Sequence, residues 1–168
     1  PQAFLDRLKT IGVTEKTGLR YVGEAEPKVK TSTEHRGWTG LSLTQMAIGY
    51  EVTQTPLQTL ALYNAVANNG RMMRPQLVRG LKKGSDFVKT YEPFVLNPRV
   101  CNANTLTACK SMMEAVCDPE GEGTAQRLFD DKPYTVAGKT GTARIATRNG
   151  YEQGLSLIHI SEPTRPIR

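Results

Sequence analysis

The stretch from Tyr134 to Arg144 holds the residues whose types and spacing are best suited to chemistry. A lysine ammonium is a compact positive charge, and threonine hydroxyls donate hydrogen bonds, so Lys139, Thr140 and Thr142 are suited to binding a carboxylate. Gly141 has no side chain, which would leave the backbone open to pairing with an extended peptide. The residue types therefore favour a site that binds the carboxylate end of a peptide.

These residues are predicted to lie on a β-strand that opens a hairpin. β-prone residues precede Lys139, and Asn149-Gly150 is typical of a tight hairpin turn. Because side chains of a strand alternate, Lys139 and Gly141 are expected on one face and Thr140 and Thr142 on the other. An exposed edge strand with a solvated lysine would explain the same short pattern.

A phosphate-binding loop is the weaker hypothesis for the same residues. Such a loop has a glycine five positions before the glycine that precedes the lysine, where this chain has Pro133. A helix should also follow Lys139, whereas Asn149-Gly150 predicts a hairpin. Nucleotide binding is therefore ranked below peptide binding.

Several further motifs accompany this stretch in a fixed order. They are Ala47-Ile48-Gly49-Tyr50, Thr55-Pro56-Leu57-Gln58, Ala67-Asn68-Asn69-Gly70 and Glu122-Gly123-Thr124-Ala125. They are followed, within the stretch itself, by Gly138-Lys139-Thr140-Gly141-Thr142-Ala143. The last one resembles the Lys-Thr-Gly element of penicillin-binding proteins and serine β-lactamases. Taken together, most of residues 1 to 153 is similar to class B penicillin-binding proteins, the monofunctional peptidoglycan D,D-transpeptidases.

The resemblance implies a fold and an activity. The fold would be α/β of the α+β type, a part of the penicillin-binding protein and serine β-lactamase fold in which an antiparallel sheet packs with helices. The activity would be serine acyl transfer that cross-links peptidoglycan stem peptides. Lys139 would supply positive potential and bond the serine of a second motif. Thr140, Gly141 and Thr142 would bind the substrate, with both threonine hydroxyls on its carboxylate and the Thr142 N–H directed at the oxyanion.

The resemblance also implies partners and a location. The partners would be stem peptides ending in D-Ala-D-Ala, β-lactams and the cell-wall synthesis machinery, with no cofactor and no metal. The domain would be periplasmic in a protein anchored in the inner membrane, in either division or elongation.

One departure from the family concerns the nucleophile. The family uses Ser-x-x-Lys and Ser-x-Asn, and neither pattern occurs in these 168 residues. Both are expected before Pro1, so the chain is interpreted as a C-terminal piece of a transpeptidase domain that is inactive alone. A non-catalytic peptide-binding module of the same fold would also lack them and stays an alternative.

Composition sets further bounds. Residues 1 to 153 are predicted to be one part of a domain, and residues 154 to 168 resemble translated adapter DNA and are excluded from the fold. The net charge of +6 is spread along the chain, which argues against nucleic-acid binding. Cys101, Cys109 and Cys117 lack the spacing of a zinc site, and they are either buried thiols or include one disulfide.

Hydrophobic periodicity and turn residues predict the surrounding elements. Helices are expected at 4–11, ended by Gly12, at 56–68 with a Thr55–Gln58 capping box, and from Asn104 or Thr105 to Val116. Leu57, Leu60, Ala61 and Ala65 are the expected buried stripe of the second helix. Strands or extended segments are expected at 72–78 and 86–96 around a turn at 82–85, with irregular chain at 18–40.

Overall fold

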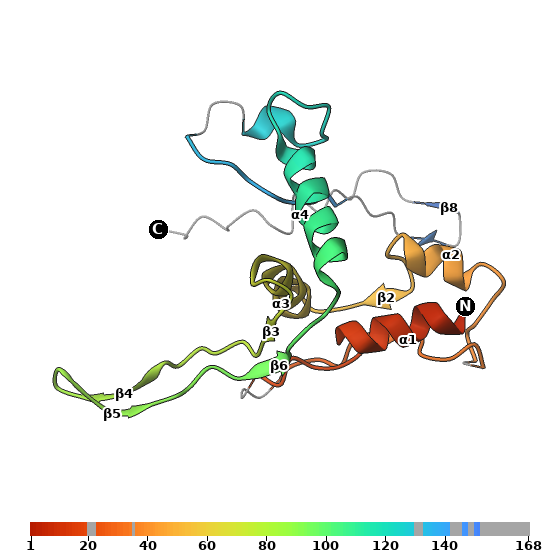
Figure 1. Ribbon diagram of the computed structural model, residues 1–168. Helices are drawn as coiled ribbons and strands as arrows, with labels where there is room; N and C mark the ends of the chain where they lie inside the picture. Colours follow the sequence, from red (N-terminus) through yellow and green to blue (C-terminus); the bar gives the residue numbers. More distant parts are fainter. Residues whose placement is uncertain (20–22, 35, 130–132, 142–145, 148–149, 152–168) are drawn as a thin grey trace. The chain divides into compact units, whose positions relative to one another are not determined.

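The computed structural model describes residues 1–19, 23–34, 36–129, 133–141, 146–147 and 150–151 (Figure 1). Contacts divide the chain into two compact units, Pro1–Cys109 and Lys110–Arg168. The helices are α1 (Gln2–Ile11), α2 (Ser42–Ala47), α3 (Pro56–Ala67) and α4 (Ala103–Cys117), with a 3₁₀ turn, η1, at Gln126–Leu128. The strands are β1 (Lys28–Val29), β2 (Val52–Thr53), β3 (Met72–Met73), β4 (Gly80–Lys83), β5 (Asp86–Thr90), β6 (Val95–Asn97), β7 (Ala146–Thr147) and β8 (Gly150–Tyr151).

The strand pairs confirm a mixed helix and antiparallel-sheet fold. Every pairing among the described residues is antiparallel: β1 with β2, β3 with β6, β4 with β5, and β7 with β8. They form separate two-stranded ladders, so the single sheet expected from the sequence is not seen in this part of the chain. The described helices are also each too short or too polar to cross a membrane.

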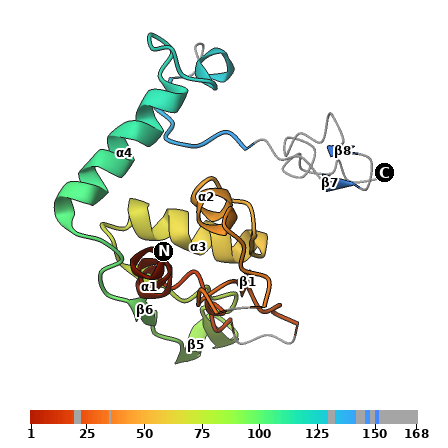
Figure 2. The ribbon, with the colours of Figure 1, turned by 90° about the vertical axis from the view of Figure 1, so that its right-hand side faces the viewer.

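Helix α1 ends where the sequence predicts. Gly12 adopts a left-handed conformation with φ 91°, and its N–H donates to the carbonyls of Leu8 and Lys9. Glycine reaches this conformation without a Cβ clash, which is why it terminates the helix. Leu5 is only 1% exposed and anchors the helix to the first unit. Helix α1 lies in the plane of Figure 1 and is seen end-on in Figure 2, whereas α3 does the reverse, so the two helices cross.

The irregular chain before α2 is held by one lysine. Lys30 follows β1, and its Nζ donates to Ser42 Oγ at 3.2 Å and to a carboxylate oxygen of Glu51 at 2.5 Å. Ser42 is fully buried at the start of α2, and Glu51 has a positive φ of 58° just before β2. Through these bonds, Lys30 joins the chain after β1 to the start of α2 and to the turn before β2.

Helix α3 has the predicted beginning. Thr55 Oγ1 accepts from the Gln58 N–H at 3.2 Å, and Gln58 Oε1 accepts from the Thr55 N–H at 2.8 Å, which confirms the capping box. Its buried face differs from the prediction: Ala61 and Ala65 are buried, but Leu60 is 53% exposed. The helix is rich in apolar residues along its length, and β3 packs on the face that carries Ala65.

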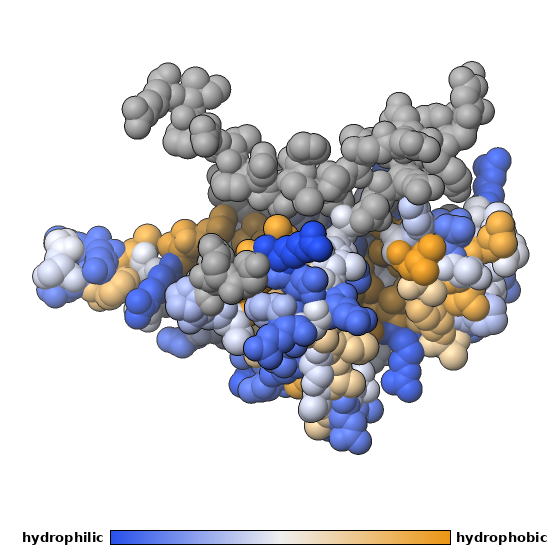
Figure 3. All heavy atoms as spheres, turned by 90° about the horizontal axis from the view of Figure 1, so that it is seen from above, coloured by the Kyte–Doolittle hydropathy of each residue, from blue (hydrophilic) through white to orange (hydrophobic). Residues whose placement is uncertain are grey.

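The strands after α3 are shorter than predicted. β3 and β6 pair next to the core residues Ala65 and Val100, while β4 and β5 form a hairpin whose turn includes Gly84 at φ 66°. Pro75 and Pro93 lie between the two ladders, where a missing N–H prevents continuous pairing. The hairpin extends away from the helices of its unit, and Figure 3 shows hydrophobic and hydrophilic side chains interspersed along it.

Helix α4 begins earlier than the sequence indicated. Asn102 Oδ1 accepts from the Thr105 N–H at 2.8 Å, so Asn102 caps the helix. The predicted caps, Asn104 and Thr105, lie inside the first turn instead. All three cysteines are free thiols, and Cys117 is buried at the end of the helix. The disulfide left open by the sequence is therefore absent.

Candidate active-site segment

The segment from Tyr134 to Gly141 forms neither a helix nor a strand. Exposure alternates from Val136 to Gly141, with Lys139 exposed and Thr140 half-buried, as the predicted side-chain alternation requires. None of these residues pairs with a strand in the described part of the chain, so the predicted strand is wrong here. A strand exists only with a neighbour to bond its backbone, and this segment bonds to a helix instead.

The C-terminal end of α4 supports the segment. The Gly138 N–H donates to the carbonyl oxygen of Met113 at 3.0 Å. A Cβ placed on Gly138 would lie 3.5 Å from the sulfur of Cys117, so the backbone passes directly beside this buried thiol. The position of Lys139, one residue later, is therefore set by the last turn of α4.

A pair of threonines joins the segment to the preceding loop. Thr124 Oγ1 and Thr140 Oγ1 lie 2.8 Å apart, within hydrogen-bond distance, and either oxygen can be the donor. Lys139 folds back so that its Nζ donates to the Thr140 carbonyl at 2.7 Å. An ammonium and two hydroxyls thus gather around one residue of the segment.

The loop that carries Thr124 is packed onto the same helix end. A Cβ at Gly123 would overlap the carbonyl oxygens of Ala115 and Val116, so only glycine fits there. The next anchor is Ala125, which is 5% exposed and donates its N–H to Val116 at 3.0 Å. Thr124 is thereby held between two residues that are fixed to α4.

The structure describes three of the four predicted site residues. Lys139, Thr140 and Gly141 are consecutive and reach solvent to different degrees, with Gly141 exposed. Thr142 lies outside the described residues. Sequence reasoning missed Thr124 as a neighbour of the site, although it quoted the motif Glu122-Gly123-Thr124-Ala125; the glycine next to the threonine was the available signal.

The hairpin that follows the segment tests the phosphate-loop hypothesis. β7 and β8 pair with Ala146 opposite Tyr151 and Thr147 opposite Gly150, so the predicted hairpin is confirmed. A phosphate-binding loop leads directly into a helix whose N–H groups bind the phosphate. The chain after Lys139 forms a hairpin in its described part, which contradicts the nucleotide-binding alternative.

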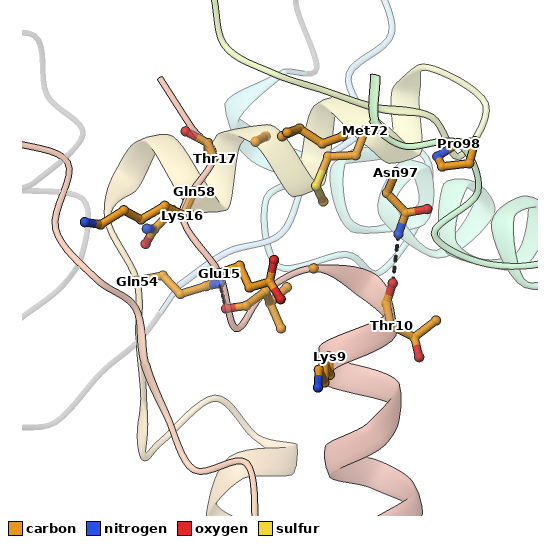
Figure 4. Close-up of a pocket in the computed structure, with 14 residues that line it drawn as sticks. Lys9, Thr10, Glu15, Lys16, Thr17, Gln54, Gln58, Met72, Asn97 and Pro98 are labelled. Carbon is orange, nitrogen blue, oxygen red and sulfur yellow. Dashed lines mark hydrogen bonds between the residues drawn. The ribbon is translucent and has the colours of Figure 1, made fainter. Parts of the chain in front are cut away.

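A separate cavity of about 270 Å³ lies in the first unit between α1, α3 and β6 (Figure 4). Three polar side chains of its lining are bonded to other parts of the fold. Gln54 Nε2 donates to the Val13 carbonyl at 2.8 Å, and Asn97 Nδ2 donates to the Thr10 carbonyl at 2.8 Å. Gln58 is 4% exposed, and besides its capping bond it donates to the Ala25 carbonyl at 3.0 Å. These bonds indicate that the cavity's polar lining holds loops in place.

Comparison with known proteins gives a family model and curated relatives. The model described as "Penicillin binding protein transpeptidase domain" matches residues 1–161. The chain is 31% identical over 147 residues to penicillin-binding protein PbpB of Mycobacterium tuberculosis, covering 86% of the chain and 21% of that protein. It is 28% identical to the peptidoglycan D,D-transpeptidase MrdA of Haemophilus influenzae, covering 84% of the chain and 23% of that protein.

Solved structures give the same result at the level of fold. The chain matches apo penicillin-binding protein 3 of Mycobacterium tuberculosis with a TM-score of 0.74 and 30% identity, over 91% of this chain and 34% of that chain. The same protein in complex with ampicillin also matches with a TM-score of 0.74 and 30% identity, over 91% of this chain and 34% of that chain. The chain thus spans about a fifth to a third of the length of these relatives.

Proposed function

The chain belongs to the penicillin-binding protein transpeptidase domain family, and from this premise we propose that it is part of a peptidoglycan D,D-transpeptidase. The complete protein would cross-link stem peptides by serine acyl transfer. The observation that carries this proposal is the segment at the end of α4. It presents an exposed Lys139 beside Thr140, whose hydroxyl is held by a second hydroxyl.

The proposed reaction has two acyl-transfer steps. A serine hydroxyl attacks the carbonyl carbon of the penultimate D-alanine, and its proton passes to a base. The base then gives this proton to the nitrogen of the terminal D-alanine, which leaves as the free amine when the C–N bond breaks. An amine of a neighbouring stem peptide then attacks the acyl-enzyme ester, forms the new amide and returns the serine hydroxyl. The serine and its lysine are proposed to lie in the part of the protein outside this chain.

The residues of this chain would bind and orient the substrate. The Lys139 ammonium provides positive potential for the terminal carboxylate, because a compact charge attracts an anion without requiring a rigid geometry. Thr140 donates its hydroxyl proton to that carboxylate. Gly141 leaves room for the peptide backbone, and the Thr142 N–H donates to the oxyanion of the tetrahedral intermediate.

The same site would react with β-lactams, which carry a carboxylate next to a strained amide. The two structural relatives above include a complex with ampicillin, which supports this part of the proposal. We also propose the location implied by the family resemblance. The complete protein would be anchored in the inner membrane with this domain in the periplasm, in contact with other enzymes of wall synthesis.

Covalent labelling with a fluorescent penicillin tests the proposal. The complete protein that contains this chain should form a labelled band that survives denaturing electrophoresis. The 168-residue chain alone should not be labelled, because no Ser-x-x-Lys nucleophile occurs in it. A labelled band from the chain alone would identify a nucleophile within it, and no label on the complete protein would refute the transpeptidase assignment.

Variants of Lys139 in the complete protein test its role. Lys139→Ala should lower the second-order rate of acylation by about 100-fold or more, as for other groups that stabilise transition-state charge, with little change in thermal stability. Lys139→Arg should recover only part of the rate, since a planar fork replaces a compact ammonium. Lys82→Ala removes another exposed lysine from β4 and should react at the parent rate. An unchanged rate for Lys139→Ala would mean that this lysine is only a solvated surface residue.

A further inference from the structure

The hydroxyl pair at the candidate site has a direction that proton counting can assign. Thr124 Oγ1 and Thr140 Oγ1 lie 2.8 Å apart, and each threonine has a single hydroxyl proton. One of the two oxygens donates, and the other accepts. Which one donates decides whether the Thr140 proton is free to bind anything else.

Both threonines are fixed to the same structural support. Gly123 and Ala125 attach Thr124 to the last turn of α4, through close packing on Val116 and through a 3.0 Å backbone bond to it. Gly138 attaches the Thr140 side through its 3.0 Å bond to Met113 in the same helix. The spacing between the two hydroxyls is therefore a property of the fold, although Thr124 itself is exposed.

A carboxylate ligand removes the ambiguity. Ionised carboxylates only accept hydrogen bonds, so Thr140 must donate its one proton to bind a substrate carboxylate. Thr140 then has no proton for Thr124, and the 2.8 Å contact persists only if Thr124 donates to Thr140. Accepting that bond also polarises the Thr140 hydroxyl, which strengthens its own donation.

We propose that Thr124 is a positioning residue of the transpeptidase: it donates to Thr140 and thereby directs the Thr140 proton to the substrate carboxylate. This inference rests on the proposed function. Thr124 does not touch the substrate in this scheme and acts only through Thr140. Loss of its hydroxyl leaves the Thr140 proton free to rotate, and the substrate must then fix it.

The test compares two β-lactams in the complete protein, one with a free carboxylate and its methyl ester, which lacks the negative charge. Thr124→Val keeps the side-chain shape and removes the hydroxyl. It should lower the acylation rate of the free acid by about fivefold to tenfold, the value of one neutral hydrogen bond, and leave that of the ester nearly unchanged. Thr124→Ser restores a hydroxyl at the same backbone position and should recover most of the loss.

Two further variants distinguish positioning from general structural damage. Thr140→Val removes the group through which Thr124 acts, so adding Thr124→Val to it should cause no further loss. Thr10→Val removes a threonine hydroxyl that bonds within α1 to the Asp6 carbonyl and should leave the ratio of acid to ester rates unchanged. Equal losses for the acid and the ester in Thr124→Val, or additive losses in the double variant, would overturn the proposal.

The same data separate this inference from the proposed function. If the complete protein is acylated and Lys139→Ala slows it, but Thr124→Val leaves the ratio of acid to ester rates at the parent value, only the role of Thr124 fails. If the complete protein is not acylated at all, the transpeptidase assignment fails, and the role of Thr124 fails with it.

Discussion

Helix α3 and the Lys139 segment obtain their order in opposite ways. At the start of α3, the bonds that fix the chain join Thr55 and Gln58, and at its end the Gly70 N–H returns to the Ala65 carbonyl at 2.7 Å. In the Lys139 segment, the Gly138 N–H bonds to Met113, and Thr140 bonds to Thr124, sixteen residues away. The ends of the helix are fixed by bonds between neighbouring residues, whereas the segment is fixed by bonds to distant residues of its unit.

The difference has a consequence for mutations. A substitution of the Thr55 cap should affect the start of α3 and little else, because the bonds of the capping box are local. A substitution in the loop before the Lys139 segment should disturb the segment although the two are separate in the sequence.

Gly123→Ala should release the Lys139 segment. The new Cβ overlaps the carbonyl oxygens of Ala115 and Val116, so the loop must move away from α4, at a cost of about 1–3 kcal/mol typical of overpacking. The readout is hydrogen exchange of the Gly138 amide in the complete protein, which should lose protection. Gly40→Ala is the matched control, because a Cβ there meets nothing within 4 Å. If the Gly138 amide stays protected in Gly123→Ala, the segment does not depend on this loop.

The contrast also explains what the sequence could predict. Three predicted features depend only on residues close to one another in the sequence. They are helix α1 with its glycine stop, the α3 capping box and the Gly84 hairpin turn. Each signal needs a backbone partner within a few positions, so the sequence pattern and the structure agree. The mixed antiparallel fold followed from the family resemblance, and the structural comparisons support it.

The errors arise where a distant partner decides. The segment before Gly141 has strand-like residues and alternating exposure, but a strand also needs a neighbour, and its backbone meets α4 instead. Leu60 lies on an apolar helix, yet it is 53% exposed. Thr124 looked like part of a loop motif, and only the folded chain shows that its hydroxyl reaches Thr140. Hydrophobic periodicity indicates the secondary structure that a residue prefers, but it does not indicate which distant residue it contacts.

Thr55→Ala should destabilise the start of α3 by about 1 kcal/mol, the usual value of an N-cap. The change removes the acceptor for the Gln58 N–H, which should then exchange faster in the complete protein. Thr59→Ala, one turn into the helix on an exposed position, should have little effect or a slightly stabilising one, because alanine favours helix. Because the defining bonds of α3 are local, Gly138 exchange should not change in either variant. A parallel loss of Gly138 protection in Thr55→Ala would contradict the separation of the two regions.

The smallest expected effect concerns a loop of intermediate span. Glu24 accepts bonds from the Thr17 N–H at 2.6 Å, the Thr17 hydroxyl at 2.7 Å and the Leu19 N–H at 3.2 Å, over five to seven residues. Burial acts to raise the pKa of this carboxyl, but the bonds from Thr17 and Leu19 outweigh it and lower the pKa below the ordinary glutamate value. The carboxylate therefore stabilises the folded loop fully at pH values above the ordinary glutamate pKa. This contribution is lost as the pH falls through the lowered pKa.

Glu24→Gln removes the charge at every pH and so isolates this contribution. At neutral pH the variant should be slightly less stable than the parent, because the amide accepts the Thr17 and Leu19 bonds more weakly than a carboxylate. As the pH falls below the ordinary glutamate value, the parent should lose stability and the difference between the two should shrink. The measurement is thermal unfolding of both proteins from neutral to acidic pH, with Glu15→Gln as a control on the same stretch of chain. A stability difference that stays constant across this range would show that the charge of Glu24 does not hold the loop. The loop would then owe its order, as the Lys139 segment does, to contacts from more distant parts of its unit.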